Sequence, residues 1–327
     1  MRKTVTGVLG AAALLLANAQ PAAAQGQAFL TFGGSDAVGS LLDLQNKQFT
    51  KIVNEKAAGK MKVNFISGEQ LGNDMQVIEQ MMQNAVQVYG DVLDWYANWV
   101  KDFAILAWGF TFRDADHMQR FLESDIYAAM AEKLRKEQGL RILAAAPTQP
   151  RILFAKKPVA KLEDLKGIKM RVPEIKTYLT LWETLGTRPS RLAWSEVYLG
   201  LKTGVVEAAE GPINSAYAAK FHEAVKYVMR TDHLLSSAHI TMNEQAFQKL
   251  SPELQKLLVE SAREAVKWTR AAAEKDTEET VKKMATEGAT VMAVDRPSIN
   301  AKAREAVAMM EKDGSWSAGL WEKIQGM

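Results

Sequence analysis

Residues 161–173 read KLEDLKGIKMRVP, a polar turn that leads into a short strand. Apolar side chains alternate along that strand with a lysine and with Arg171, so Arg171 lies on the face opposite the apolar one. Pro173 ends the strand because it has no N–H to donate. A guanidinium held just before such a break is well placed to bind a carboxylate through two parallel hydrogen bonds, and the alternative is a surface ion pair.

Outward from this stretch, strand-like and helix-like segments alternate along the chain. Short apolar segments predict strands at 62–66, 86–89, 141–145, 151–155, 168–172, 205–209, 227–229 and 239–242. Helices are expected at 74–84, 117–139, 175–185 and 195–202. Strands separated by helices favour an α/β protein with mostly parallel sheets. The Thr-Gln-Pro break at 148–150 indicates a crossing between two domains.

The C-terminal third predicts one long helix. Ser251 is a typical N-cap and Pro252 suits the first helical position. No proline or glycine interrupts the chain from there to Glu287. A helix of that length spans roughly 50 Å, so we expect it to cross both domains. Two helices with a break near 271–274 are the alternative.

The N-terminus predicts export. Residues 1–24 combine two basic residues, an apolar run and a small-residue site, which is typical of a signal peptide cleaved after Ala24. No cysteine follows the apolar run, so no lipoprotein anchor is expected. No later segment reaches the roughly 20 apolar residues that span a bilayer. We therefore expect a periplasmic protein that is not embedded in the membrane.

Composition narrows the function further. Removing Arg2 and Lys3 leaves 39 basic and 38 acidic residues. That balance argues against a nucleic-acid or membrane-surface partner. The absence of cysteine excludes disulfides, thiolate metal sites and cysteine nucleophiles.

The central block carries a family resemblance. Residues 151–173 read RILFAKKPVAKLEDLKGIKMRVP, and residues 185–212 read LGTRPSRLAWSEVYLGLKTGVVEAAEGP. These segments resemble the solute-binding proteins of TRAP (tripartite ATP-independent periplasmic) transporters, the dicarboxylate-binding type of receptor. GEQLGNDMQVIEQM at 68–81 and NEQAFQKLSPELQ at 243–255 are similar to further parts of that family. The resemblance covers essentially the whole mature chain.

The resemblance implies a two-lobed, hinged receptor that binds an organic acid between its lobes and delivers it to the TRAP membrane subunits. It implies lobe I at 25–148 and 237–275, lobe II at 149–236 and 276–327, and one long helix packed on both. It also implies that Arg171 pairs with the ligand carboxylate, that Arg151 is a second polar contact, and that Trp194 lies against the ligand.

One departure bears on specificity. Residues 210–212 read Glu-Gly-Pro where family members usually have Glu-Asn-Pro. Glu210, Gly211 and Trp95 are expected to belong to the ligand-binding site, where Gly211 leaves a larger and less polar pocket. Together with Trp108 and the Trp95–Tyr96 pair, it hints at a bulkier or aromatic acid rather than a small dicarboxylate such as succinate.

Other classes of function have weaker support. A minority branch of the family binds 2-oxo acids through a metal ion, for which Glu210 is a candidate ligand, but no cofactor is expected. The four histidines form no zinc-binding spacing, and no G-x-S-x-G or Walker motif is present. The Gly-Gly-Ser segment at 33–35 is interpreted as a tight turn that lines the cleft. An exported hydrolase or lyase, and a receptor that serves a sensor, are the alternatives.

Overall fold

The computed structural model describes residues 27–327, so the predicted signal peptide and its cleavage site lie outside the described residues. Within this range one mixed sheet runs through the protein in the order β2-β1-β3-β8-β4-β7-β5-β6, with β9 beside β8. Its strands are β1 (Ala28–Gly33), β2 (Met61–Ile66), β3 (Val88–Tyr89), β4 (Leu140–Ala155), β5 (Lys169–Val172), β6 (Arg188–Arg191), β7 (Ala208–Pro212), β8 (Tyr227–Asn243) and β9 (Thr290–Ala293).

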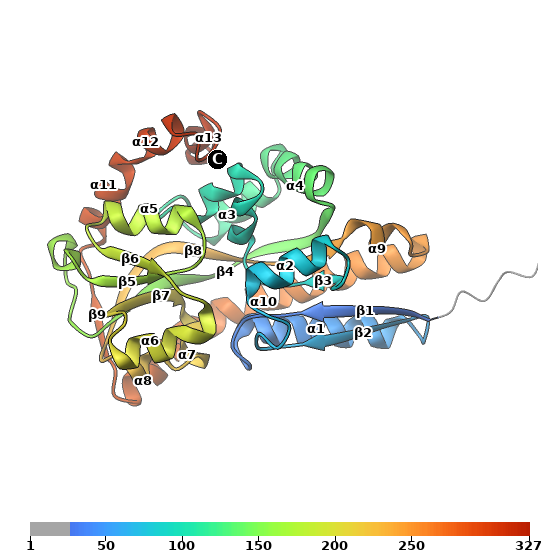
Figure 1. Cartoon of the computed structure of the whole chain (residues 1–327), viewed down its shortest axis with the longest axis horizontal. Helices are drawn as coiled ribbons and strands as arrows, with labels where there is room; N and C mark the ends of the chain where they lie inside the picture. The colour runs from blue at the N-terminus through green and yellow to red at the C-terminus, as the bar shows by residue number, and fades with distance from the viewer. Residues whose placement is uncertain (1–26) are drawn as a thin grey trace, which may run out of the picture.

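Helices cover the sheet in two groups, which form the two lobes of an α/β protein (Figure 1). The first lobe carries α1 (Leu41–Lys56) and α2 (Asp74–Met82). The second carries α5 (Lys176–Thr184), α6 (Val197–Thr203), α7 (Ile213–Ala218) and α8 (Phe221–Ala224). The other α-helices are α3 (Ala115–Leu122), α4 (Asp125–Gln138), α9 (Glu244–Gln248), α10 (Pro252–Thr286), α11 (Arg296–Glu305), α12 (Val307–Lys312) and α13 (Leu320–Gln325). Short 3₁₀ helices are η1 (Leu93–Asn98), η2 (Lys101–Ala107), η3 (Leu162–Leu165) and η4 (Trp194–Glu196). Among these described residues, no helix is both long and apolar enough to cross a membrane.

Two long strands connect the lobes, which the sequence did not predict. The segments expected at 141–145 and 151–155 are parts of the single strand β4, and those at 227–229 and 239–242 are parts of β8. The break at 148–150 is an irregularity inside β4, where its register against β8 shifts between Pro147 and Pro150. Prolines are tolerated at such bulges because the ladder is already interrupted there.

The sheet is mixed rather than mostly parallel. The pairs β1–β2, β1–β3, β5–β6, β5–β7 and β8–β9 are parallel, as expected for strands joined by helices. The central pairs β3–β8, β4–β8 and β4–β7 are antiparallel. The expectation was wrong at the centre because β4 and β8 traverse both lobes in opposite directions.

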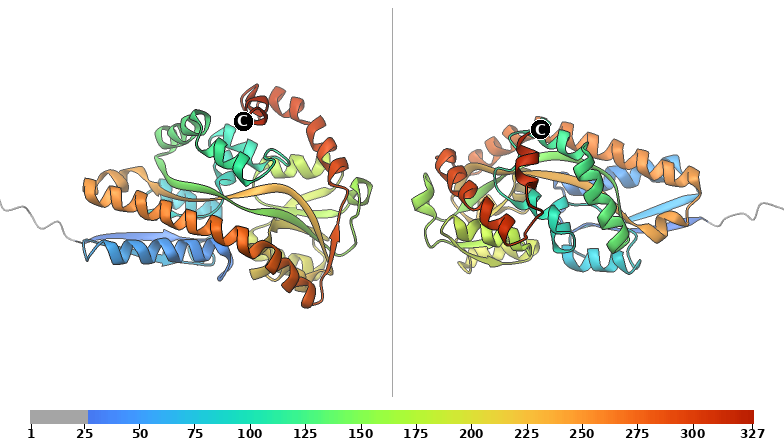
Figure 2. Two further views of the ribbon diagram at one scale, coloured as in Figure 1. Left: turned by 180° about the vertical axis from the view of Figure 1, so that it is seen from behind. Right: turned by 90° about the horizontal axis from the view of Figure 1, so that it is seen from above.

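Helix α10 is one unbroken helix, as predicted, and the alternative of two helices was wrong. Ser251 caps it by accepting a hydrogen bond from the backbone N–H of Leu254. Its first half packs on α1 of one lobe through Leu258. Its last turns pack on α7 of the other lobe through Met284. Figure 2 shows it running along both lobes from behind. The long apolar face thus joins both lobes.

Candidate functional site

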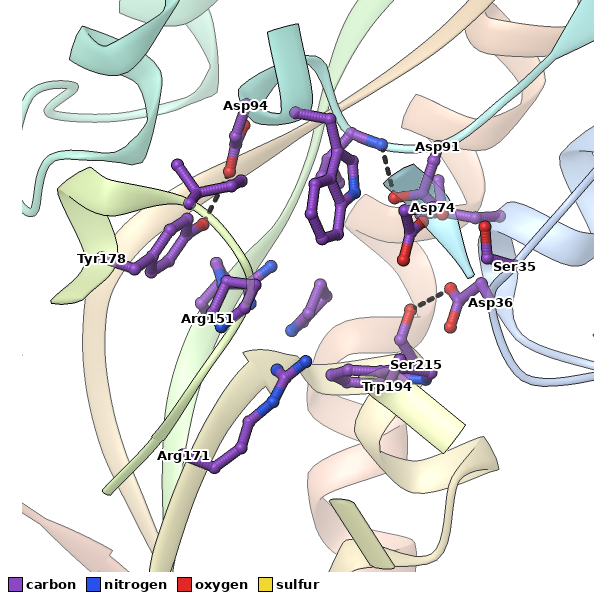
Figure 3. Close-up of a pocket in the computed structure, with 16 residues that line it drawn as sticks. Ser35, Asp36, Asp74, Asp91, Asp94, Arg151, Arg171, Tyr178, Trp194 and Ser215 are labelled. Atoms are coloured by element: carbon purple, nitrogen blue, oxygen red, sulfur yellow. Dashed lines mark hydrogen bonds between the residues drawn. The ribbon is translucent and has the colours of Figure 1, made fainter. Parts of the chain in front are cut away.

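A cavity lies between the two lobes (Figure 3). Its polar wall is formed by Ser35, Asp36, Asp74, Asp91, Asp94, Arg151, Arg171 and Ser215. Its aromatic wall is formed by Trp95, Tyr178 and Trp194. Most of these residues lie at or just beyond the carboxyl ends of β1, β3, β5 and β7, the usual position of ligand sites in α/β sheets.

Arg171 lies in the cavity wall on β5, between β6 and β7, with 1% of its surface exposed. Its Nε and Nη2 donate to the carbonyl of Leu192 at 2.9 and 2.7 Å. Nη1 is buried and has no hydrogen-bond partner within the described part of the chain. Burial lowers the pKa of Arg171 to about 10, so the guanidinium is charged at neutral pH. The Leu192 carbonyl therefore occupies the Nε–Nη2 edge of the guanidinium, and Nη1 remains as a free donor for a carboxylate.

Arg151 also lines the cavity, but it is neutralised by Glu210. Its Nε and Nη2 donate to the two carboxylate oxygens of Glu210 at 2.5 and 2.6 Å. Nε2 of His233 lies 3.3 Å from the same carboxylate. Burial would raise the pKa of Glu210, yet the Arg151 charge outweighs it and lowers the pKa to about 2. Glu210 is thus fully buried in an ion pair, behind the cavity wall.

Gly211 does not enlarge the pocket, because the indole of Trp194 occupies the space beside it. A Cβ placed on Gly211 would lie 2.7 Å from Cη2 of Trp194. The same indole packs beside the Arg171 guanidinium, 5.4 Å from the ring centroid, and tilts against Phe221. The absence of a side chain at Gly211 therefore leaves room for the indole of Trp194 in the cavity wall.

The other aromatic candidates divide between pocket and core. Trp95 lines the cavity, as expected. Trp108 is fully buried and packs against Trp316, while Tyr96 stacks on His239. Neither Trp108 nor Tyr96 faces the ligand cavity, so the specificity hint drawn from them was wrong. Aromatic residues in a sequence do not distinguish a pocket from a hydrophobic core.

Sequence reasoning missed the acidic side of the cavity. Asp36 follows β1, in the turn that was correctly expected to line the cleft. Asp74 is the first residue of α2, and Asp91 and Asp94 follow β3. All four side chains are at most 8% exposed. The signal was weak because these aspartates come from three separate segments.

Burial raises the pKa of each of these carboxyl groups. The pKa of Asp74 and that of Asp94 rise to about 6, and that of Asp91 lies well above its usual range. Repulsion among Asp36, Asp74 and Asp91 adds to this effect. The Arg151 charge opposes it at Asp94. We call Asp36, Asp74 and Asp91 the acidic wall.

Contacts between the lobes close the cavity. Ser215 of α7 donates to Asp36 at 2.6 Å, and Tyr178 of α5 donates to Asp94 at 2.6 Å. The backbone N–H of Leu41 donates to the Asn214 side chain at 2.7 Å. These bonds join the loops of the first lobe to helices of the second, so the structure has the cleft closed.

The sequence model of "Bacterial extracellular solute-binding protein, family 7" (DctP) matches residues 32–313. The chain belongs to this family. Among relatives, it is 27% identical over 325 residues to the 2,3-diketo-L-gulonate-binding periplasmic protein YiaO of Escherichia coli, covering 98% of each chain. It is 28% identical to a solute-binding protein of Roseobacter denitrificans, covering 76% of each.

Solved structures of TRAP periplasmic solute-binding proteins have the same fold. One from Pseudomonas putida F1 with bound D-glucuronate is 26% identical, with a TM-score of 0.84 over 91% of this chain and 97% of that one. One from Actinobacillus succinogenes with bound L-galactonate is 25% identical, with a TM-score of 0.85 over 91% and 98%. The family-7 chain is thus a TRAP-type binding receptor with two lobes, and the hydrolase or lyase alternative is set aside.

The packing at Gly211 gives a first prediction for this family-7 receptor. Gly211→Ala should weaken ligand binding by about tenfold, because the new methyl group displaces the indole of Trp194. Titration calorimetry measures the affinity. In a Trp194→Phe background the same substitution should cost less, since the two residues are in contact. An equal loss of ligand affinity in both backgrounds would show that the effect of Gly211→Ala does not depend on the indole of Trp194.

Proposed function

We propose that this protein is a periplasmic receptor that captures an organic acid between its lobes and delivers it to TRAP membrane subunits. The observation that carries the proposal is the buried Arg171, which lines the cavity and whose Nη1 has no partner in the described chain. The relatives support it, since the ligands in their names are acids: 2,3-diketo-L-gulonate, sialic acid and C4-dicarboxylates. Solved neighbours hold D-glucuronate and L-galactonate.

The ligand carboxylate would bind at the end of the Arg171 guanidinium. Since Nε is taken by the Leu192 carbonyl, the carboxylate meets Nη1 and the second hydrogen of Nη2. Arg151 has two of its nitrogens on Glu210, so we expect it to contribute less to binding. The indoles of Trp95 and Trp194 would cover the apolar part of the ligand.

Binding would be coupled to hinge closure. We place the hinge in β4 and β8, near the register shift at 147–150, which coincides with the proposed lobe boundaries at 148/149 and 236/237. Helix α10 crosses the same boundary. A ligand that contacts both lobes favours the closed form because it binds that form more tightly than the open form. The closed receptor then presents a composite surface to the membrane subunits. Cleavage after Ala24 would release it into the periplasm.

A screen of carboxylates by thermal denaturation tests the proposal. Ligand at about 100 times its dissociation constant should add roughly 2.7 kcal/mol of stability. Acids with a ring or a branched chain should stabilise the protein more than succinate, malate or fumarate, because two indole faces line the cavity. The methyl ester of the best acid is the control and should have no effect. Stabilisation by ester and acid alike would contradict a carboxylate receptor.

A further inference from the structure

The acidic wall faces Arg171 across the cavity. Asp36, Asp74 and Asp91 come from the first lobe, and Arg171 comes from β5 of the second. In Figure 3 the guanidinium of Arg171 points into the cavity from one side, and the three carboxyl groups lie on the other. The cavity therefore has one positive and one negative end, and each end belongs to a different lobe.

The carboxyl groups of the acidic wall accept hydrogen bonds, but they have no cationic partner in the described part of the chain. Ser215 and the Ala37 N–H donate to Asp36, at 2.6 and 2.8 Å. Tyr89 donates to Asp74 at 2.5 Å. The Val92 N–H donates to Asp91 at 2.7 Å. Within residues 27–327 none of the three carboxylates forms an ion pair with a lysine, arginine or histidine. Burying carboxylates together without a counter-charge is costly, and burial accordingly raises the pKa of all three groups. A cationic group bound in the cavity would favour their ionised forms.

A simple anion does not complement this cavity. Arg151 and Glu210 neutralise each other, so among the described residues that line the cavity Arg171 is the single cation without an ion-pair partner. The carboxylate of a ligand would use that charge and leave the acidic wall unbalanced. Neutral hydroxyl groups could donate hydrogen bonds to the aspartates, but they would not offset the repulsion among them. An ammonium group would do both.

We infer that the ligand is a zwitterion, with its carboxylate on Arg171 and a protonated amine against Asp36, Asp74 and Asp91. This inference rests on the proposed function and refines it. A ligand of this kind joins the oppositely charged lobes, so both of its ends favour closure.

Matched pairs of probes test the inference by titration calorimetry. Each pair has the same carbon frame and differs only in an amine or a hydroxyl at the end remote from the carboxylate. We would use 4-aminobutanoate with 4-hydroxybutanoate, 6-aminohexanoate with 6-hydroxyhexanoate, and the 4-aminomethyl and 4-hydroxymethyl derivatives of cyclohexanecarboxylate. The tightest-binding pair should favour the amine by about tenfold or more, the gain of one good charge contact.

The outcomes separate this inference from the proposed function. If hydroxy acids bind as tightly as their amino partners or more tightly, the zwitterion is wrong and the carboxylate receptor stands. If no acid of either kind binds, while the larger carboxylate screen also gives no stabilisation, the proposed function fails and the inference fails with it.

Variants of the acidic wall give an independent readout. Asp74→Asn and Asp91→Asn keep the size and an acceptor oxygen but remove the charge. Each substitution should lower the affinity for the amino acid by about tenfold, and it should leave the affinity for the matched hydroxy acid unchanged or raise it. Asp313→Asn, at an exposed aspartate after α12, makes the same change in net charge and should alter neither. Equal losses for both members of a pair would show that the aspartates serve only as hydrogen-bond acceptors.

Proton release supplies a third readout. Burial raises the pKa of Asp74 to about 6, so near pH 6 this carboxyl group is partly protonated in the free protein. Burial also raises the pKa of Asp91 above its usual range. Binding an ammonium group favours the ionised carboxylates and should release protons, which calorimetry in two buffers of different ionisation enthalpy detects. The hydroxy acid should release none, and equal release by both would contradict the inference. The charged and titratable groups near the wall are Asp43, Glu69, Tyr89, Tyr96, Arg171 and His239.

Discussion

Arg171→Ala should weaken binding of the ligand by about 2–5 kcal/mol, the cost of removing one partner from a buried, hydrogen-bonded charge pair. The reason is that Arg171 is 1% exposed and its Nη1 has no partner among the described residues, so water does not compete with the ligand there. Arg171→Lys should also weaken ligand binding. A lysine ammonium lacks the planar guanidinium that can bond the Leu192 carbonyl along one edge and the ligand carboxylate at its end.

Calorimetry of both variants measures the loss, with circular dichroism to check the fold. The matched control is Arg188→Ala, which removes an exposed arginine from the neighbouring strand β6 and should leave the affinity unchanged. A folded Arg171→Ala protein that retains the affinity of the wild type would refute the assignment of Arg171.

Arg151→Ala should act mainly on stability and reduce the free energy of unfolding by about 3–5 kcal/mol. The substitution leaves the carboxylate of Glu210, which is fully buried, without the ion pair that keeps it charged. Urea denaturation measures the loss. In the double variant Arg151→Ala/Glu210→Gln the loss should be smaller than the sum of the single losses, because the two side chains are in direct contact.

The pH dependence provides a check on the same ion pair. Burial opposes ionisation of Glu210, but Arg151 lowers its pKa to about 2, below the usual value of 4.5. A depressed pKa stabilises the folded state above the unfolded pKa, and this contribution is lost as the pH falls toward 2. The difference between wild type and Arg151→Ala should therefore narrow in acid. A constant difference from pH 7 to pH 3 would contradict the role of the pair.

The sequence predicted most of the cavity-lining residues that belong to the second lobe. Arg171, Arg151 and Trp194 were assigned through their motifs, and all three line the cavity. The strand β5 was predicted from its alternating apolar residues and the helix α10 from its N-cap. Both signals come from residues that are adjacent in the sequence. The ligand-binding roles of these residues remain predictions.

The acidic wall could not be predicted, because three aspartates far apart in the sequence meet only through the pairing of β1 with β3 and the position of α2. The same limit explains the error at Gly211. An absent side chain predicts open space, but the neighbouring indole of Trp194 fills it. The division of β4 into two separate strands was wrong as well, since prolines that normally end strands occur here within a bulge of β4.

The most direct test of the account is a crystal structure of the protein with the acid that stabilises it best in the screen. We predict that the carboxylate lies about 2.7–2.9 Å from Nη1 of Arg171, the usual distance for a charge-assisted hydrogen bond. The opposite end should lie against the acidic wall. A ligand whose carboxylate binds elsewhere in the cavity, with Nη1 of Arg171 still free, would contradict the proposed mode of capture.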